Sequence, residues 1–168
     1  MKIDSSSLRS IQEPLKAEYR ANPKAAIVTL KASARVGEGI TCKVETGKAL
    51  AEAGLHPATG GDGLSVCSGD MLLEALAACA GVTLKAVATA IDFAMKDAKV
   101  HVEGDLDFRG TLSVDRNAPV GFKTIRLKFQ IDTEEPQEKI DTLIKLTERY
   151  CVVYQTLAQA NTIQITTN

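Results

Sequence analysis

The sequence is poor in aromatic residues and has no excess of charge of either sign. It contains no tryptophan, and aromatic residues make up 4% of its 168 residues. Its 20 lysines and arginines are balanced by 21 aspartates and glutamates, which leaves a formal net charge of −1. Stacking platforms for bases and a basic stripe for phosphates are therefore both missing. We expect neither nucleic acid nor a membrane surface as a partner.

Signals for secretion and for a metal site are also missing. The first residues, MKIDSSSLRSIQEPLK, contain no apolar stretch of the kind found in signal peptides, so we expect a cytoplasmic protein whose four cysteines are reduced. The only histidines, His56 and His101, belong to no C-x-x-C or H-x-x-H pattern, and we predict neither zinc nor another cofactor. The glycines of residues 59–63 lack the G-x-x-x-x-G-K-[ST] pattern of a phosphate loop and indicate a flexible loop.

The longest hydrophobic run, residues 71–91, is long enough to cross a membrane. It contains Glu74 and Lys85 and has no aromatic residues at its ends, which is typical of a core helix. The whole pattern predicts one α+β domain over residues 1–168, with helices packed on antiparallel sheets and a helical N-terminal extension over residues 1–22, kinked or restarted at Pro14.

Alternating apolar residues predict strands, and apolar residues three and four apart predict helices. Gly104 and Gly110 indicate bulges or a bend in the longest strand. The expected strands are residues 26–34, 39–45, 100–114, 125–131 and 162–166, with a turn at 35–39 and a glycine-rich loop at 46–69. The expected helices are residues 69–96, 134–149 and 150–160.

Two cysteines lie where these core helices are expected, and they form a candidate redox couple. Cys79 falls inside the helix expected over residues 69–96 and shares its apolar face with Leu72, Leu76 and Thr83. Cys151 follows the helix expected over residues 134–149. Burial on an apolar face raises the pKa of a thiol, and the helix dipole does not extend so far into a helix. A reactive Cys79 therefore requires a cation from elsewhere in the fold. The alternative is an inert, packed thiol.

Three segments of this chain resemble the OsmC/Ohr family (osmotically inducible protein C and organic hydroperoxide resistance protein). They are DMLLEALAACAGVTL at residues 70–84, YCVVYQTL at residues 150–157, and the preceding strand–turn–strand with Arg35. The resemblance extends from about residue 25 to the end. It implies an OsmC-like fold, with antiparallel sheets packed on two long central helices, in an intertwined homodimer.

The resemblance also implies a thiol peroxidase that needs no metal, flavin or haem. Cys79 matches the peroxidatic cysteine, which attacks an organic hydroperoxide and becomes a sulfenic acid. Cys151 matches the resolving cysteine, which condenses with that sulfenic acid to a disulfide, and an external dithiol would reduce it. An apolar lining near Cys79 would suit alkyl hydroperoxides better than hydrogen peroxide, because each buried CH₂ contributes about 0.8 kcal/mol.

Two charged residues match further positions of the family site. Arg35 matches the arginine that would stabilise the Cys79 thiolate, and its alternative role is that of a solvated arginine in a turn. Asp70 matches the glutamate that holds the arginine. On a straight helix Asp70 lies about 13 Å along the axis from Cys79 and roughly 180° around it. It would therefore act from an N-cap position or across a dimer interface, or else it simply caps the helix.

Departures from the family pattern keep a second function open. Asp70 is shorter than glutamate, and Val152 stands where proline usually follows the resolving cysteine. These changes are compatible with an OsmC-fold protein that binds a small ligand without turnover. Of the other cysteines, Cys42 alternates with apolar residues of a strand and is expected in the core, while Cys67 is either a packed thiol or a third redox partner.

Overall fold

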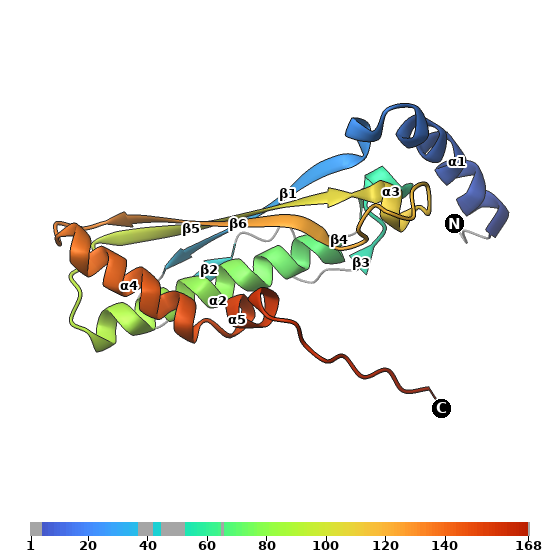
Figure 1. Ribbon diagram of the computed structural model, residues 1–168. Coiled ribbons are helices and arrows are strands. Elements are labelled where there is room, and N and C mark those ends of the chain that lie inside the picture. Colours follow the sequence, from blue (N-terminus) through green and yellow to red (C-terminus); the bar gives the residue numbers. More distant parts are fainter. Residues whose placement is uncertain (1–4, 37–41, 45–52, 65, 168) are drawn as a thin grey trace.

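The computed structural model describes residues 5–36, 42–44, 53–64 and 66–167, and for residues 5–9, 29–36, 42–44 and 53 it describes the backbone alone. A four-stranded antiparallel sheet with the strand order β2-β1-β5-β6 forms one layer (Figure 1). Strand β5 pairs with β1 on one side and with β6 on the other over most of its length, so strands distant in sequence form one surface. The strands are β1 (Ile27–Val36), β2 (Cys42–Val44), β5 (Asp97–Asp107) and β6 (Phe122–Asp132).

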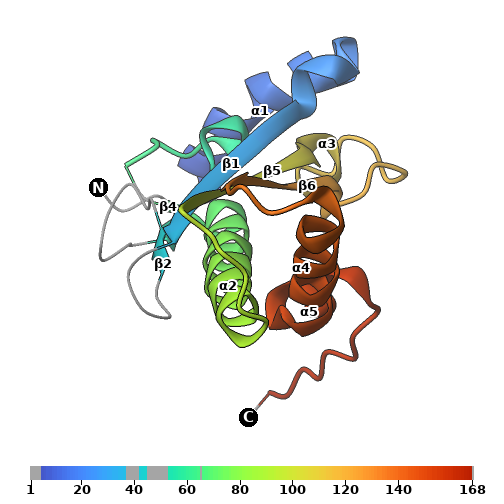
Figure 2. The same cartoon turned by 90° about the vertical axis from the view of Figure 1, so that its left-hand side faces the viewer.

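A second layer of helices covers one face of this sheet. The long helix α2 (Ser68–Ala90) and the helix α4 (Gln137–Tyr150) lie side by side beneath it, and α5 (Val152–Ala158) follows α4 directly (Figure 2). The core forms where α2 meets the inward residues of β5. It contains small residues that let the helix approach the strands closely, and its buried members are Leu73, Leu76, Ala77, Ala80, Val100, Val102 and Cys151.

By length and composition, α2 is the one helix in the described part of the chain that could cross a membrane. Its face formed by Leu73, Leu76, Ala80 and Leu84 is fully or almost fully buried under the sheet. This packing is what the charges within the run led us to expect of a core helix.

The N-terminal part of the chain packs at one end of the sheet. Helix α1 (Ser5–Ala21) contacts the segment that precedes α2, where the hydroxyl of Tyr19 donates a hydrogen bond of 2.7 Å to the carbonyl of Ala58. Ile27 and the rest of β1 follow a single 3₁₀ turn. The elements of this end are α1, η1 (Pro23–Ala26), β3 (Ala53–Gly54), η2 (Pro57–Thr59), β4 (Val66–Cys67) and α3 (Phe108–Thr111), with β3 and β4 forming a short parallel pair inside the predicted loop.

The predicted α+β class and the antiparallel sheet are confirmed, and several element ends differ from the prediction. The turn expected from residue 35 starts later, because Arg35 still pairs with Lys43 on one side and Lys99 on the other. The helix expected to reach residue 96 ends at Ala90. Asp92 there has a φ of 51°, a left-handed conformation that aspartate tolerates but a helix does not.

The strand expected over residues 100–114 is also shorter than predicted. It ends at Asp107, whose side chain accepts a hydrogen bond from the backbone N–H of Arg109 and thereby caps α3. The apolar residues Phe108 and Leu112 of the expected strand are buried, and they lie on a helical turn instead. Gly104 pairs regularly with Ile125, and the break in register lies between Asp105 and Leu106.

The strand predicted over residues 162–166 is absent. This segment runs away from the molecule as a tail (Figure 1), and Ile163 and Ile165 are 83% and 88% exposed. Alternation of apolar and polar residues creates a strand only where a neighbouring strand supplies hydrogen bonds, and none does here within the described part of the chain. In the helical layer α2 has 23 residues and α4 has 14, so one of the two long helices expected is confirmed.

Candidate functional site

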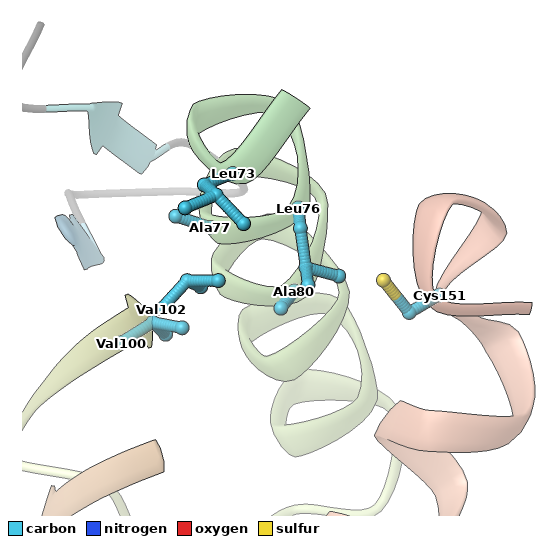
Figure 3. Close-up of a cluster of buried hydrophobic side chains, with 7 residues drawn as sticks. All are labelled: Leu73, Leu76, Ala77, Ala80, Val100, Val102 and Cys151. Atoms are coloured by element: carbon cyan, nitrogen blue, oxygen red, sulfur yellow. The ribbon is translucent and has the colours of Figure 1, made fainter. Parts of the chain in front are cut away.

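Cys79 and Cys151 lie next to each other, although 71 residues separate them in the sequence. Cys79 is in the middle of α2, and Cys151 both ends α4 and begins α5. The side chain of Cys151 is 1% exposed, and its sulfur points toward α2 (Figure 3). The Cys79 side chain is half-buried and packs against the same cluster. Solvent therefore reaches Cys79 but not Cys151.

The polar groups around the sulfur of Cys79 lower its pKa. Burial by itself would raise the pKa of this thiol, but the donors around it reverse the effect and lower the pKa below its ordinary value. Thr83, one turn further along α2, contributes its hydroxyl. The other donors come from the start of α5, and they are the backbone N–H groups of Val152 and Val153 and the thiol of Cys151.

The environment of Cys151 has the opposite effect. Burial is the main cause that raises its pKa, to about 11, and the hydrogen bond that it donates to Cys79 raises it further. Backbone N–H groups of Tyr154 and Val153 oppose this rise but do not overcome it. A single negative charge shared by the two sulfurs is therefore stabilised on Cys79, and Cys151 retains its proton. This asymmetry distinguishes an attacking thiolate from a neutral thiol partner.

The expected position of Cys79 on its helix was wrong in one respect. Leu72, which was expected on the same buried face as Cys79, is exposed. The face of α2 that is buried under the sheet contains Leu73, Ala80 and Leu84. Cys79 lies beside this buried face and is directed toward α5. The requirement for a cation followed from a fully apolar environment. Sequence patterns do not reveal which helix end will lie against a given side chain, so they did not indicate the backbone N–H groups of α5 near Cys79.

The structure tests the two charged candidates unequally. The backbone of Arg35 lies in β1, opposite Lys99, and its side chain lies outside the described part of the structure, as does that of Cys42. Asp70 lies in the first turn of α2, and the N-cap is Cys67, so Asp70 is not the capping residue considered above. Burial raises the pKa of Asp70, and nearby His56 opposes that rise.

A cavity of about 370 Å³ lies at the N-terminal end of α2. His56, whose ring stacks on Phe108 at 4.9 Å between centroids, and Cys67 both contribute to its wall. Cys67 precedes Cys79 by twelve helical positions, or about 18 Å along the axis, which separates it from the cysteine pair. The other lining residues are mainly apolar: Gly54, Leu55, Thr59, Ser68, Gly69, Leu72, Leu106, Phe108, Thr111, Val120, Gly121 and Phe122.

A second cavity, of about 300 Å³, lies between α2, β6 and α5, and neither Cys79 nor Cys151 is among its lining residues. Leu76, one turn before Cys79, and Tyr154, one turn after Cys151, contribute to its wall. The remaining lining is apolar except at one end: Phe122, Lys123, Thr124, Ile125, Leu127, Leu157 and Ala158. Sequence patterns did not indicate it, because its residues come from three separate segments. Within the described residues, no three histidine, cysteine, aspartate or glutamate side chains gather as metal ligands would.

Comparison with protein-family models matches residues 60–166 to the family described as OsmC-like protein, which is more than half of the chain. This chain belongs to the OsmC-like family. Among solved structures it is similar to an OsmC-like hydroperoxide resistance protein from Jannaschia sp. CCS1, with 21% identity and a TM-score of 0.58, over 82% of this chain and 91% of that one. At this identity the likeness shows a shared OsmC-like fold. A search of curated proteins finds no match.

The OsmC-like match includes both cysteines of the pair and Asp70, and it begins after Arg35. The family predicted from the two cysteine motifs is thereby confirmed. The match is shorter than the resemblance expected from about residue 25, and α1, β1 and β2 lie before it.

Proposed function

We propose that this OsmC-like protein is a cysteine-based peroxidase that reduces organic hydroperoxides. The observation that carries the proposal is the pair formed by Cys79 and Cys151. Its accessible member has a lowered pKa, and its buried member has a raised one. A peroxide is attacked by a thiolate that solvent can reach, and the resulting sulfenic acid needs a thiol within reach. Family membership and a structural neighbour named as a hydroperoxide resistance protein support the same reaction.

The reaction needs two thiols, one peroxide and an external reductant. The Cys79 thiolate attacks the distal oxygen of R–O–OH, the O–O bond breaks, and the alkoxide takes up a proton to leave as the alcohol R–OH. Cys79 is then a sulfenic acid. The Cys151 sulfur attacks it, water leaves, and a Cys79–Cys151 disulfide forms. A small-molecule or protein-bound dithiol then transfers two electrons to this disulfide and restores both thiols.

The cavity between α2, β6 and α5 supports a substrate with an apolar group. Leu76, Ile125 and Leu157 offer hydrocarbon surface to an alkyl or aryl group on one side of the peroxide. Hydrogen peroxide has no such group and would gain nothing from this surface. We therefore expect cumene hydroperoxide to react faster with Cys79 than hydrogen peroxide does.

We further propose that the protein acts as a homodimer in the cytoplasm. Exposed apolar residues support this proposal, and they lie near the start of α2 (Met71 and Leu72) and at the α4–α5 junction (Tyr150 and Val152). A second copy would cover this surface and exclude water from the peroxide. Sedimentation equilibrium should give twice the mass of the chain. Met71→Asp should shift the protein toward monomer, whereas a change on the outer sheet face, Lys128→Ala, should not.

For Arg35 we keep the role that the family resemblance implies, a cation near the Cys79 thiolate from its own chain or its partner. Arg35→Met should then raise the pKa of Cys79, and Arg35→Lys should restore part of the shift. Asp70 would hold this arginine. Asp70→Asn should produce a smaller change in the same direction. A pKa of Cys79 that is unchanged in Arg35→Met would remove both residues from the mechanism.

The test of the proposed function is the addition of one equivalent of cumene hydroperoxide to the reduced protein. Two thiols should disappear per chain, and peptide mapping should show a Cys79–Cys151 link. In Cys151→Ser, a sulfenic acid at Cys79 should accumulate and react with dimedone. Cys79→Ser should consume no peroxide. Survival of both thiols, or a link that involves Cys42 or Cys67, would contradict the proposal.

One observation favours a second function. The cavity at the N-terminal end of α2 is larger than the one between α2, β6 and α5, its walls are mainly apolar, and Cys79 is not among its lining residues. It supports an OsmC-fold protein that binds a small apolar ligand without turnover. A fluorescent apolar probe should bind in this cavity of the wild-type protein, and Leu72→Trp, which fills part of the cavity, should weaken its binding. If the cysteine pair also fails to react with hydroperoxide, this second function replaces the first.

A further inference from the structure

The cavity at the N-terminal end of α2 has the size and the walls of a small-molecule site. Its volume of about 370 Å³ falls within the range of such sites. Phe108 in its wall is buried, whereas Leu55 and Val120 are 48% and 65% exposed. Exposed apolar residues that meet around one opening, from separate segments of the chain, are typical of a place where an apolar molecule binds.

His56 supplies this cavity with a hydrogen-bond donor. Its Nδ1 accepts a hydrogen bond of 3.0 Å from the backbone N–H of Ala58, and burial lowers the pKa of the ring, which Asp70 opposes only in part. The ring is therefore neutral at neutral pH and has its proton on Nε2. Among the described residues Nε2 has no hydrogen-bond partner, and no fully buried side-chain nitrogen or oxygen lacks one. The Nε2–H is therefore accessible to a molecule in the cavity.

The position of His56 is fixed by its own turn and by α1. Its ring stacks on Phe108 with 4.9 Å between the centroids, and its carbonyl accepts a hydrogen bond of 2.8 Å from the backbone N–H of Thr59. Helix α1 contacts the same turn through Tyr19, whose hydroxyl donates to the carbonyl of Ala58. A donor that is already fixed loses little conformational freedom when a ligand binds.

The charges around the cavity disfavour an ionic ligand. In the described part of the chain, no lysine, arginine, aspartate or glutamate lines it. The carboxylate of Asp70, which interacts with the His56 ring, would repel an anion. An uncharged apolar molecule with one acceptor oxygen matches both the walls and the imidazole N–H.

We propose that this cavity binds a neutral apolar molecule with a carbonyl oxygen, of the class of alkyl and aryl ketones, and that the Nε2–H of His56 donates to that oxygen. The proposal rests on the second function above and deepens it, because it names the chemistry of the ligand and the residue that recognises it. The match to the OsmC-like family begins at residue 60, so His56 and α1 lie outside the part of the chain that the family model covers.

The test uses two neutral fluorescent probes and the reduced protein at pH 7.5. Prodan is a dimethylaminonaphthalene with a propionyl ketone, and 2-(dimethylamino)naphthalene lacks the ketone. His56→Phe keeps an aromatic ring against Phe108 and removes the N–H. It should weaken the binding of prodan roughly three- to tenfold, the size of one hydrogen bond, and should not weaken that of the ketone-free probe.

Two tryptophan variants locate the binding. Leu72→Trp, in the wall of this cavity, should weaken the binding of both probes. Leu157→Trp, in the wall of the cavity between α2, β6 and α5, is the matched control and should change neither. A loss of binding in Leu157→Trp without a loss in Leu72→Trp would overturn the proposal.

A second measurement decides alone if His56→Phe does not fold. In the ¹⁵N-labelled wild-type protein, the proton on His56 Nε2 should shift downfield with prodan and not with the ketone-free probe. An unshifted proton, an equal loss of both probes in His56→Phe, or tighter binding of naphthalene-2-carboxylate than of prodan would overturn the proposal, while the second function would stand. If neither probe binds the wild-type protein, both are overturned. No step uses peroxide, so the peroxidase proposal is tested separately.

Discussion

Cys79 and Cys151 pack in one cluster where α2 meets the α4–α5 junction, and their mutual hydrogen bonding lowers the pKa of Cys79 and raises that of Cys151. Cys151 is buried and Cys79 is half-buried, so the sulfur that water cannot reach holds its proton more tightly. The contact between the two residues fixes the order of their chemistry, with Cys79 reacting first and Cys151 second. Neither residue could be ranked in this way from its own segment of sequence.

This order predicts the pH dependence of alkylation. Because the pKa of Cys79 is lowered, its reaction with iodoacetamide should reach its plateau at a lower pH than that of a free cysteine peptide. Cys151, with a pKa of about 11 and almost no exposure, should remain unmodified at pH 8 in the folded protein. Mass spectrometry of each peptide gives both profiles. Faster alkylation of Cys151 than of Cys79 at pH 8 would reverse the assigned roles.

Thr83 provides a test on the same helix as Cys79. Hydrogen bonding by its hydroxyl is one cause that lowers the pKa of Cys79, so Thr83→Val should remove this cause and keep the shape of the side chain. We expect the pKa of Cys79 to rise, and the reaction with cumene hydroperoxide at pH 7 to slow accordingly. Thr83→Ser keeps the hydroxyl and serves as the control. If both variants react at the wild-type rate, the hydroxyl does not act on the sulfur.

His56 should make the stability of the N-terminal end depend on pH. Its Nδ1 accepts a hydrogen bond from the N–H of Ala58, so the ring must be neutral at that nitrogen. Burial lowers its pKa, and the Asp70 carboxylate only partly opposes this. The unfolded chain therefore binds the proton more readily, and stability should fall as the pH drops through about 6.5. Urea unfolding at pH 7.5 and pH 5 should show a larger loss for wild type than for His56→Gln. Equal losses would contradict this.

Gly104 predicts a packing effect in the middle of β5. A Cβ at this position would lie 2.5 Å from the ring of Phe122, so Gly104→Ala must displace that ring. We expect a loss of about 1–3 kcal/mol in the free energy of unfolding, measured by urea denaturation. At Gly121 a Cβ would meet no atom within 4 Å, and Gly121→Ala should change stability by less than about 0.5 kcal/mol. Similar losses in the two variants would show that the ring of Phe122 does not limit the space.

Local pattern accounts for the elements that the sequence predicted well. The 23-residue helix around Cys79 and the strands of the central sheet have strong periodicity, so their existence and type follow from which side chains can be buried together. The ends of these helices and strands, by contrast, are set by single interactions. Asp107 ends a strand by capping a helical turn, and Asp92 ends α2 with a left-handed residue. Such ends depend on one side chain or one φ angle, which periodicity does not contain.

The two cysteine motifs were enough to identify the OsmC-like family, because both occur in one chain in the family's order. The reactivity of the pair was decided by tertiary structure. Burial alone would have made Cys79 a poor nucleophile, and that was the expectation from its apolar helix. The start of α5 lies against α2 and supplies backbone donors that every sequence contains and no sequence pattern displays. A thiol's pKa depends on which donors surround it in space, and only the packing of α5 on α2 determines them.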